Sequence, residues 1–430
     1  MSRPAFVVGV GMTKFEKPLT RAWDYPDMGR EAASAALRDG GLCYDDVQAV
    51  CASYCYGEPT SGQRVAYELG LTGIPIFNTN NNCSSGSSAL MIARLLIQSG
   101  AFDCVLAVGF EKMERGLSER YTDRASPVER HRASLIEMGA DVRPVTPKMN
   151  NMTSDVIKMF AYAANEHSRL YGTTPDQYAR IAHKNRKHGS NNRYACFQSE
   201  ISLQQVAKQP LLYPITTGMS AMTADGGAAA ILCSEQFMHL HRLEKNAMEI
   251  VSQHMVTDIP SSFGKSFRNL CGVEMSRLAG QRCLRDAAMS IRDVDVLEVH
   301  DCFSCNELFM YEALGMCGEG KGGGLIDEAE WVKNAAGGEV CVVGNQWVVN
   351  PSGGLESKGH PIGATGLAQC AELNWQLRGV AGKRQVDGCR VAMQHNFGLG
   401  SAAVVTLYQK YKPEQPLSVN HMKPPTASKL

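Results

Sequence analysis

The amino-acid sequence predicts an α/β fold in which helices cover a largely parallel sheet. Segments with strand character alternate with helical segments along most of the 430 residues. Every residue between Asp103 and Glu111 is apolar, which is typical of a central strand buried on both faces. A turn that opens a helix in the first half also has a counterpart in the second half. These features indicate an α/β protein built from two related halves.

The first half opens with a strand and ends with the apolar strand at 103–111. Before that strand, a polar turn rich in small residues leads into an apolar helix at 91–99, with Gly100 just past its end. The other elements expected here are a strand at 6–11, an alanine-rich helix at 27–39, a strand at 47–51 and a short buried strand at 74–77.

The character of the chain changes at about Arg115. Residues 115–148 are charged and interrupted by prolines, and 150–222 contain two polar helices, at 154–171 and 175–188. Strand character returns at 224–233. We interpret 115–222 as an insertion between two strands of one domain, of the kind that serves as a lid or a ligand-binding surface.

The second half repeats the alternation. Its expected elements are strands at 247–251 and 293–300, helices at 274–290 and 307–314, a glycine-rich turn at 347–363, a helix at 364–378, and strands at 390–395 and 402–408. We therefore divide the chain into a first half (1–114 plus 223–245), an inserted loop domain (115–222), a second half (246–410) and a tail (411–430).

The two halves share one turn. Cys83 and His360 lie 277 residues apart, and each is followed by a glycine three positions on and a leucine seven positions on. Each residue also opens a helix. If the halves are duplicated βαβ-type units packed about a pseudo-twofold axis, Cys83 and His360 face one another at the centre.

Composition excludes several classes of protein. The 43 basic and 43 acidic residues cancel, so there is no general field for nucleic acid or an anionic membrane. No apolar run reaches the roughly 18 residues of a membrane span. The 15 cysteines are scattered and odd in number, which indicates reduced thiols inside the cell. Cys302 and Cys305 form a C-x-x-C without a second pair, so no metal site is predicted.

Three turns carry reactive groups. Cys83 sits at a helix N-terminus, where the dipole and the free amides favour a thiolate, although a buried cysteine in a capping turn has the same pattern. His300 and His360 are candidate bases or hydrogen-bond donors for acyl transfer. Cys302, two residues from His300, is positioned to move a proton to and from carbon, with Cys305 as the first alternative.

Residues 5–410 resemble the thiolase superfamily. The resemblance rests on the Cys83 turn, the strand Ala224–Ala230, Gly359-His360-Pro361 and Gly398-Leu-Gly400, in family order. His300-Asp-Cys-Phe303 replaces the usual N-E-A-F and is similar to the thiolase part of sterol carrier protein X. The resemblance implies two duplicated halves packed as α/β/α/β/α layers, with a mostly helical inserted loop domain.

The resemblance also implies a reaction, which is degradative thiolysis. A 3-oxoacyl-CoA, including branched-chain or sterol side-chain acyl groups, is cleaved by free CoA to acetyl-CoA or propionyl-CoA and a shortened acyl-CoA. By family position Cys83 takes the acyl group, and His360 activates it and helps to hold the thioester oxygen. His300 completes the first oxyanion hole, and the backbone amides of Cys83 and Gly398 form the second.

The family pattern is not complete. The usual C-x-G turn reads His395-Asn-Phe-Gly398 and lacks its acid/base cysteine, a role that the subfamily pattern gives to Cys302. The resemblance implies CoA as a substrate, no permanently bound cofactor, and a homodimer or a dimer of dimers. Sterol carrier protein X continues into a lipid-transfer domain and this chain ends in a short tail, so we expect no sterol transfer from it.

Two other functions fit part of the pattern. A condensing enzyme of the ketosynthase type would use Cys83, His300 and His360 and would leave Cys302 idle. A non-catalytic acyl-CoA-binding protein would need none of them. For the phosphates of CoA, the best local basic cluster is Lys184, Arg186 and Lys187, which a solvated helix end explains equally well.

The ends of the chain bear on localisation. The first 11 residues form a strand-like segment and do not resemble a signal peptide. The last three, Ser428, Lys429 and Leu430, form the tripeptide that the peroxisomal import receptor reads, at the end of a polar, proline-rich tail. The sequence therefore predicts a protein of the peroxisomal matrix.

Overall fold

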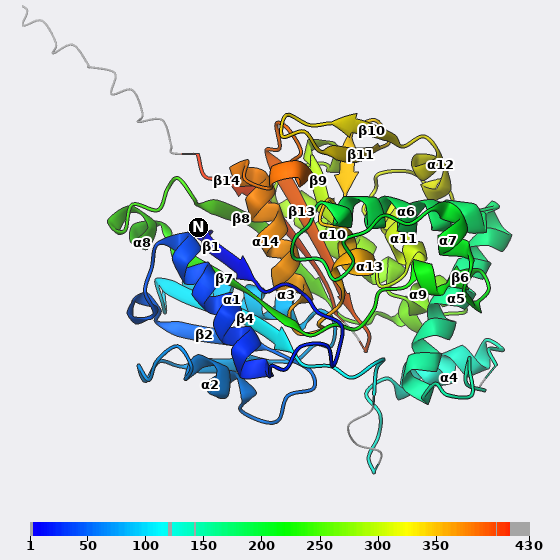
Figure 1. Cartoon of the computed structure of the whole chain (residues 1–430), viewed down its shortest axis with the longest axis horizontal. Coiled ribbons are helices and arrows are strands. Elements are labelled where there is room, and N and C mark those ends of the chain that lie inside the picture. The colour runs from blue at the N-terminus through cyan, green and yellow to red at the C-terminus, as the bar shows by residue number, and fades with distance from the viewer. Residues whose placement is uncertain (1–2, 119–122, 142, 401, 413–430) are drawn as a thin grey trace, which may run out of the picture.

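A computed structural model describes residues 3–118, 123–141, 143–400 and 402–412, with helices on both sides of a long sheet (Figure 1). The strands are β1 (Ala5–Met12), β2 (Ala49–Ser53), β3 (Ile76–Thr79), β4 (Cys104–Glu111), β5 (Pro210–Leu212), β6 (Ile215–Thr216), β7 (Gly226–Ser234), β8 (Met248–Val256), β9 (Val296–Glu298), β10 (Glu330–Lys333), β11 (Glu339–Val343), β12 (Trp347–Val349), β13 (Val391–Gly398) and β14 (Ala402–Lys410).

The helices are α1 (Tyr25–Gly40), α2 (Ser61–Ala66), α3 (Ser85–Gln98), α4 (Glu129–Glu137), α5 (Asn151–Tyr171), α6 (Pro175–Ser190), α7 (Leu203–Ala207), α8 (Glu235–Leu240), α9 (Phe267–Leu270), α10 (Val273–Asp286), α11 (Ser304–Ala313), α12 (Gly322–Asp327), α13 (Gly354–Lys358) and α14 (Thr365–Arg378). None of the described helices is long and apolar enough to cross a membrane.

The layers follow the predicted order. Helix α1 covers one face of β1, β4 and β7, and α3 and α14 lie side by side between the strands of the two halves. Helix α10 covers the far face of β8 and β14. The predicted α/β/α/β/α arrangement is therefore confirmed, and one of its apolar core clusters lies where α3 and α14 meet both sets of strands.

The sheet differs from the largely parallel one that the sequence predicts. Its twelve strands run in the order β10-β11-β12-β9-β13-β14-β8-β1-β7-β4-β2-β3, and the halves join through β1 and β8. Among the described strands, parallel pairing is confined to β2 with β3 and β4, and to β9 with β12 and β13. The sheet is mixed because β13 and β14 form a hairpin, which must be antiparallel, and because β7 follows the insertion instead of a crossover helix.

The segment 74–77, expected to be a short buried strand, instead overlaps a strand at the edge of the sheet. Strand β3 pairs only with β2 among the described strands and lies at the end of the sheet. Its Phe77 is 39% exposed. An apolar run near an edge has the same composition as a buried strand, so only the pairing order distinguishes the two.

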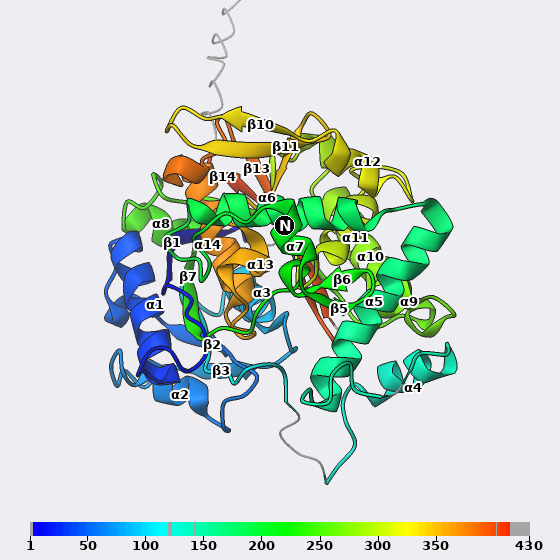
Figure 2. The ribbon, with the colours of Figure 1, turned by 45° about the vertical axis from the view of Figure 1, so that its right-hand side comes forward.

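The insertion leaves and re-enters the sheet at neighbouring strands. Strands β4 and β7 pair with each other, and residues 115–222 run between them. Helix α5 begins at the cap Asn150, whose side chain accepts the Thr153 N–H, and ends at Gly172 in the left-handed region. Helix α6 packs on α11 and α13 of the second half (Figure 2). The domain boundaries at 114, 222, 245 and 410 remain a prediction.

The two related helices touch at their first turns. A Cβ atom at Gly366 would lie 2.3 Å from the Ser87 Oγ and 2.4 Å from the Ser87 N, so only glycine allows α14 to approach α3 this closely. Gly86 lies against the same turn, with Gly366 N 3.0 Å from its ideal Cβ position. This contact brings together the turns that precede α3 and α14.

Candidate active site

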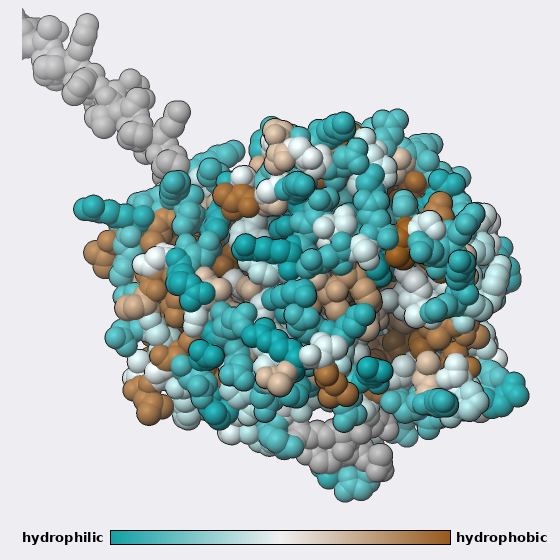
Figure 3. Space-filling view, in the orientation of Figure 1, coloured by the Kyte–Doolittle hydropathy of each residue, from teal (hydrophilic) through white to brown (hydrophobic). Residues whose placement is uncertain are grey.

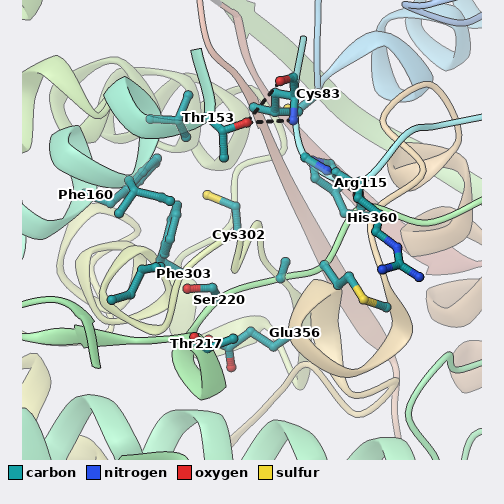
Figure 4. Close-up of a pocket in the computed structure, with 18 of the residues that line it drawn as sticks. Cys83, Arg115, Thr153, Phe160, Thr217, Ser220, Cys302, Phe303, Glu356 and His360 are labelled. Atoms are coloured by element: carbon teal, nitrogen blue, oxygen red, sulfur yellow. Dashed lines mark hydrogen bonds between the residues drawn. The ribbon is translucent and has the colours of Figure 1, made fainter. Parts of the chain in front are cut away.

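A cavity of about 750 Å³ lies where the two halves meet the insertion. The space-filling view shows a hollow with apolar side chains on the side of the insertion (Figure 3). One wall comes from α5 and includes Val156, Ile157 and Phe160, with Phe303 and Phe397 from the second half. The four catalytic candidates from the sequence all line this cavity: Cys83, Cys302 and His360, which Figure 4 labels, and His300.

The turn at Cys83 is held by its small polar residues. The Ser84 hydroxyl donates to the Asn81 carbonyl at 2.8 Å, and the Ser85 hydroxyl donates to the Asn82 carbonyl at 2.6 Å. Asn82 takes a left-handed conformation, with φ at 51°. Cys83 therefore immediately precedes Ser84, the N-cap of α3, as the sequence indicates.

The charge state of Cys83 differs from the expectation. Burial raises the pKa of its thiol to about 12, and the backbone N–H groups of Cys83 and Leu399 lower it only in part. The prediction that the helix terminus favours a thiolate is wrong here, because desolvation outweighs the nearby amides. The thiol is protonated at neutral pH, and a nucleophilic role requires a base.

His360 has the geometry of that base. The Thr365 hydroxyl donates to the Pro361 carbonyl at 3.1 Å, so its oxygen accepts from the His360 Nδ1–H, 2.6 Å away. The proton of the neutral ring is therefore on Nδ1, and Nε2 carries a lone pair. This Nε2 is buried and has no hydrogen-bond partner among the described residues. Burial lowers the pKa of His360 to about 3, so the ring is neutral at physiological pH.

His300 lies beside His360. The ring centroids are 5.2 Å apart and the rings are nearly perpendicular, at 76°. His300 Nδ1 is 3.1 Å from the Asn396 Nδ2. Burial, followed by His360 and His395, holds the pKa of His300 well below its usual value, so this ring is also neutral. The sequence did not indicate Thr365, which bonds to His360 five residues earlier, or Asn396, whose partners Ser87 and His300 lie far along the chain.

The two halves meet at these side chains. The Cys83 sulfur and one ring nitrogen from each of His300 and His360 all lie within 4.8 Å of one another. Cys83 and His360 thus occupy the matched turns of the repeat and face the same point. In the described part of the chain this trio is also the one group with suitable donor atoms for a metal ion, which sequence spacing did not reveal.

The two thiols of the C-x-x-C have different surroundings. Cys302 lines the cavity, and burial together with the nearby Cys83 holds the pKa of its thiol well above the usual value. Cys305 is fully buried on α11, with its sulfur 3.6 Å from the Phe160 carbonyl oxygen, and does not line the cavity. The Asp301 carboxylate, which accepts the Leu355 N–H at 2.7 Å, ties this turn to α13.

The backbone N–H groups near the Cys83 sulfur are close to those expected for the second oxyanion hole. Gly398 packs on the Cys83 turn, where a Cβ would lie 2.3 Å from the Asn81 carbonyl oxygen, so only glycine fits. The second amide that lies against the Cys83 sulfur belongs to Leu399, one residue beyond Gly398. Leu399 is thus a candidate donor that the sequence pattern did not single out.

Two of the three basic residues proposed to bind the phosphates of CoA, Lys184 and Lys187, do not face the cavity. The ammonium of Lys184 is buried, 2.7 Å from the Glu307 carboxylate and 2.8 Å from the Val349 carbonyl oxygen, so it cannot reach a ligand. Lys187 pairs with Glu339 at 2.9 Å and does not line the cavity.

Arg186 does line the cavity, with its guanidinium 4.1 Å from the Phe197 ring. Lys17, 5.0 Å from the same ring, and Arg115 are two further cationic lining residues that the sequence reading missed. The basic group at this cavity is therefore drawn from three distant segments. Its members have no local motif that could have revealed them.

One acidic side chain also lines the cavity. Glu356, on α13, is 2% exposed and accepts the Ser304 hydroxyl at 2.6 Å. Burial, followed by Asp301, holds the pKa of Glu356 well above its usual value, which favours a neutral acid. The sequence did not reveal this buried carboxyl, because it places Glu356 in an expected glycine-rich turn, where the structure has the short helix α13.

Comparison with protein families gives two matches. Residues 5–212 match the model of the thiolase N-terminal domain, and residues 264–410 match that of the thiolase C-terminal domain. Together the two matches span most of the chain.

Individual relatives agree with these models. The chain is 53% identical to sterol carrier protein 2 of Oryctolagus cuniculus over 95% of this chain and 72% of that protein. It is 50% identical to sterol carrier protein 2 of Homo sapiens, over 96% and 73%. The non-specific lipid-transfer protein-like 2 of Caenorhabditis elegans is 44% identical and is covered over 95% of its length, with 94% of this chain.

Solved structures show the same fold at low identity. The human mitochondrial 3-ketoacyl-CoA thiolase in complex with CoA superposes with a TM-score of 0.67 and 19% identity, over 95% of this chain and 98% of that one. The Ltp2-ChsH2(DUF35) aldolase superposes with a TM-score of 0.75 and 19% identity, over 96% and 99%. One fold therefore serves more than one reaction, and the reaction must be argued from the side chains.

Proposed function

The chain belongs to the thiolase family, and we propose that it is a degradative thiolase that cleaves 3-oxoacyl-CoA with free CoA. The observation that carries this proposal is the convergence of Cys83, His300 and His360 within 4.8 Å, with the second thiol, Cys302, on the same cavity. A nucleophile, a base, a donor and a separate acid/base group are the parts that thiolysis needs.

In the first half-reaction, His360 Nε2 takes the proton from the Cys83 thiol, and the sulfur attacks the 3-oxo carbon of the substrate. Backbone amides, those of Cys83 and Gly398 or Leu399, stabilise the oxygen on the attacked carbon, and His300 stabilises the thioester oxygen that becomes negative when the bond to C2 breaks. The bond between C2 and C3 then breaks. Its electron pair goes to C2, which takes the proton of Cys302, and acetyl-CoA or propionyl-CoA leaves.

The second half-reaction returns the enzyme to its starting state. The Cys302 thiolate takes the proton of the incoming CoA thiol, whose sulfur attacks the thioester on Cys83. The bond to Cys83 breaks, the shortened acyl-CoA leaves, and the Cys83 thiolate regains its proton from His360. No oxidant and no bound cofactor is required, and CoA acts as a substrate.

Neither the ketosynthase alternative nor the binding-protein alternative uses Cys302. A thiolysis assay with free CoA and 3-oxoacyl-CoA substrates of straight, branched and sterol side-chain type separates the three. Cleavage with release of acetyl-CoA or propionyl-CoA is expected, and the apolar wall formed by α5 supports acyl chains of some bulk. Binding without cleavage for every substrate would contradict the proposal.

We further propose that Arg186, Lys17 and Arg115 receive the phosphates of CoA. Arg186→Ala is expected to raise the KM for CoA about tenfold with little change in kcat, because a charged hydrogen bond contributes about 1.5–3 kcal/mol. Lys187→Ala is the matched control, since Lys187 is paired with Glu339 away from the cavity. Equal effects of the two variants in steady-state kinetics would refute this assignment.

For localisation, we propose the peroxisomal matrix. Removing Leu430 is expected to leave the protein in the cytosol with unchanged activity, because the terminal tripeptide is read by the import receptor. Residues 428–430 lie outside the described residues, so the proposal rests on the sequence. Imaging of a fusion that leaves the C-terminus free tests it, and continued import of the shortened protein would exclude a C-terminal address.

We also propose a homodimer joined along β3. Phe77 on this edge strand is 39% exposed, and nearby Leu71 and Leu95 are 81% and 49% exposed. An unpaired, apolar strand edge is a site for pairing with another chain. Sedimentation should give twice the 46.8 kDa of one chain, and a monomer that turns over substrate would contradict the proposal.

A further inference from the structure

Asn396 lies where the C-x-G pattern of ordinary thiolases has a cysteine, and it connects the two halves of the active site. It is fully buried on β13, close to α3 of the first half and to His300 of the second. Its side chain contacts Ser87 at 2.8 Å and His300 at 3.1 Å. It replaces a reactive group with an amide, which has no acid or base function at neutral pH.

A chain of buried hydrogen bonds supports the orientation of this amide. The chain starts at Gln394, whose Nε2 is 2.7 Å from the Gly366 carbonyl oxygen. A carbonyl oxygen only accepts, so the nitrogen of Gln394 must be the atom on this side. The Gln394 Oε1 then accepts the Tyr408 hydroxyl at 2.6 Å.

The next links run through Ser87. The second N–H of Gln394 donates to the Ser87 oxygen at 2.8 Å, and the Ser87 hydroxyl donates to the Asn396 Oδ1. With Oδ1 on Ser87, the Asn396 Nδ2 faces His300 Nδ1, which has to accept. Since His300 is neutral, its single ring proton is on Nε2.

The two histidines of the site therefore have opposite tautomers. His360 has its proton on Nδ1 and a free lone pair on Nε2, whereas His300 presents an N–H at Nε2. The first is able to take a proton from Cys83, and the second is able to donate a hydrogen bond to an oxygen that becomes negative. Without a fixed tautomer, either ring could adopt either role.

From this geometry we infer that Asn396 is a positioning residue that keeps His300 in the Nε2–H form, as the oxyanion donor of the reaction. This positioning role of Asn396 rests on the proposed thiolase function, but the Nε2–H tautomer of His300 rests only on the hydrogen bonds described above. Asn396 does not line the cavity. It acts through His300, and it links that histidine to Ser87 on the helix that follows Cys83.

The critical variant is Asn396→Asp. The new carboxylate accepts a hydrogen bond from Nδ1–H, so the neutral ring loses its proton at Nε2, and kcat for thiolysis at pH 8 should fall about 10²-fold, as for removal of one oxyanion donor. An adjacent negative charge also raises the pKa of His300. Below this new pKa both nitrogens are protonated, so the deficit in kcat should shrink as the pH falls.

Asn374→Asp provides the matched control. Asn374 is buried on α14, outside the cavity, and donates to the Cys370 carbonyl. Asn374→Asp tests whether a buried carboxylate elsewhere changes how kcat depends on pH. We expect this variant to keep the pH dependence of the unsubstituted protein. A loss of activity in the Asn396 variant that is the same at every pH would overturn the inference in favour of a purely structural role.

The tautomer can also be measured without a variant. Protein labelled with ¹⁵N at its 11 histidines shows separate shifts for protonated and unprotonated ring nitrogens, and the spectrum of His300→Gln identifies the signals of His300. A proton on Nε2 is expected. A proton on Nδ1 would overturn the inference, whereas an absence of thiolysis in the unsubstituted protein would overturn the proposed function and leave this result intact.

Discussion

Cys83→Ala is expected to abolish both thiolysis and the formation of an acyl-enzyme, with CoA affinity largely unchanged. The sulfur of Cys83 forms the covalent bond, and no other described thiol lies within 4.8 Å of both His300 and His360 as a potential ligand. The binding energy of CoA comes from other contacts, so the variant should still bind CoA. Mass spectrometry of protein mixed with a 3-oxoacyl-CoA measures the first effect, and calorimetry with CoA measures the second.

Cys55 supplies the control for this experiment. Its sulfur lies 3.4 Å from the Ser85 Oγ and 3.3 Å from the Asn82 carbonyl oxygen, so it contacts the same turn from outside the cavity. Cys55→Ser should keep the acylation. Acylation mapped to a cysteine other than Cys83 would defeat the assignment, as would full turnover by Cys83→Ala.

Cys302→Ser is expected to lower thiolysis turnover at least about 10²-fold, which is the usual contribution of a positioned acid/base group. Serine keeps the size and a weak donor, but its hydroxyl has a far higher pKa than a thiol, so it transfers protons poorly to and from carbon. Acyl transfer to Cys83 should persist. The exchange of the α-protons of acetyl-CoA with deuterated water, followed by NMR, should fall in parallel with turnover.

This variant separates the thiolase from a ketosynthase. A decarboxylating ketosynthase generates its carbanion by loss of carbon dioxide and has no use for a proton donor at that carbon. Cys305→Ser is the control, because Cys305 belongs to the same C-x-x-C but lies outside the cavity. Near-normal turnover and exchange in Cys302→Ser would show that Cys302 is a packing residue.

Predictions from the sequence were accurate where interactions between residues close in the chain determine the structure. Small polar residues beside Cys83 make side-chain hydrogen bonds to the backbone within three residues, so the turn was predictable. The helix was expected from residue 91, but α3 already begins at Ser85. The shared glycines of the repeat around Cys83 and His360 are Gly86 and Gly363, and a Cβ atom at Gly86 would lie 3.1 Å from the Gly363 carbonyl oxygen, so the repeat marks a close contact between the two turns. The α/β class follows from the alternation of strands and helices, whereas the order of the layers was implied by the family resemblance.

Predictions from the sequence were wrong where contacts between distant segments decide the structure. Lys184 and Arg186 are two residues apart on α6, and successive helix positions turn by about 100°, so their side chains point in opposite directions. Lys184 meets Glu307, which is far along the chain, whereas Arg186 reaches the cavity. Likewise, the mixed sheet depends on which strands become neighbours, and no short window of sequence contains that choice.

The sequence by itself determined which residues are candidates for the reactive groups and which turns hold them, because turn chemistry acts over a few residues. Only the tertiary structure decided their protonation. Burial raises the pKa of the Cys83 thiol to about 12 and lowers that of His360 to about 3, and both shifts come from desolvation by segments distant in the chain. The proton positions on His300 and His360 depend on Asn396 and Thr365 for the same reason, since hydrogen bonding acts over about 3 Å in space and not along the sequence.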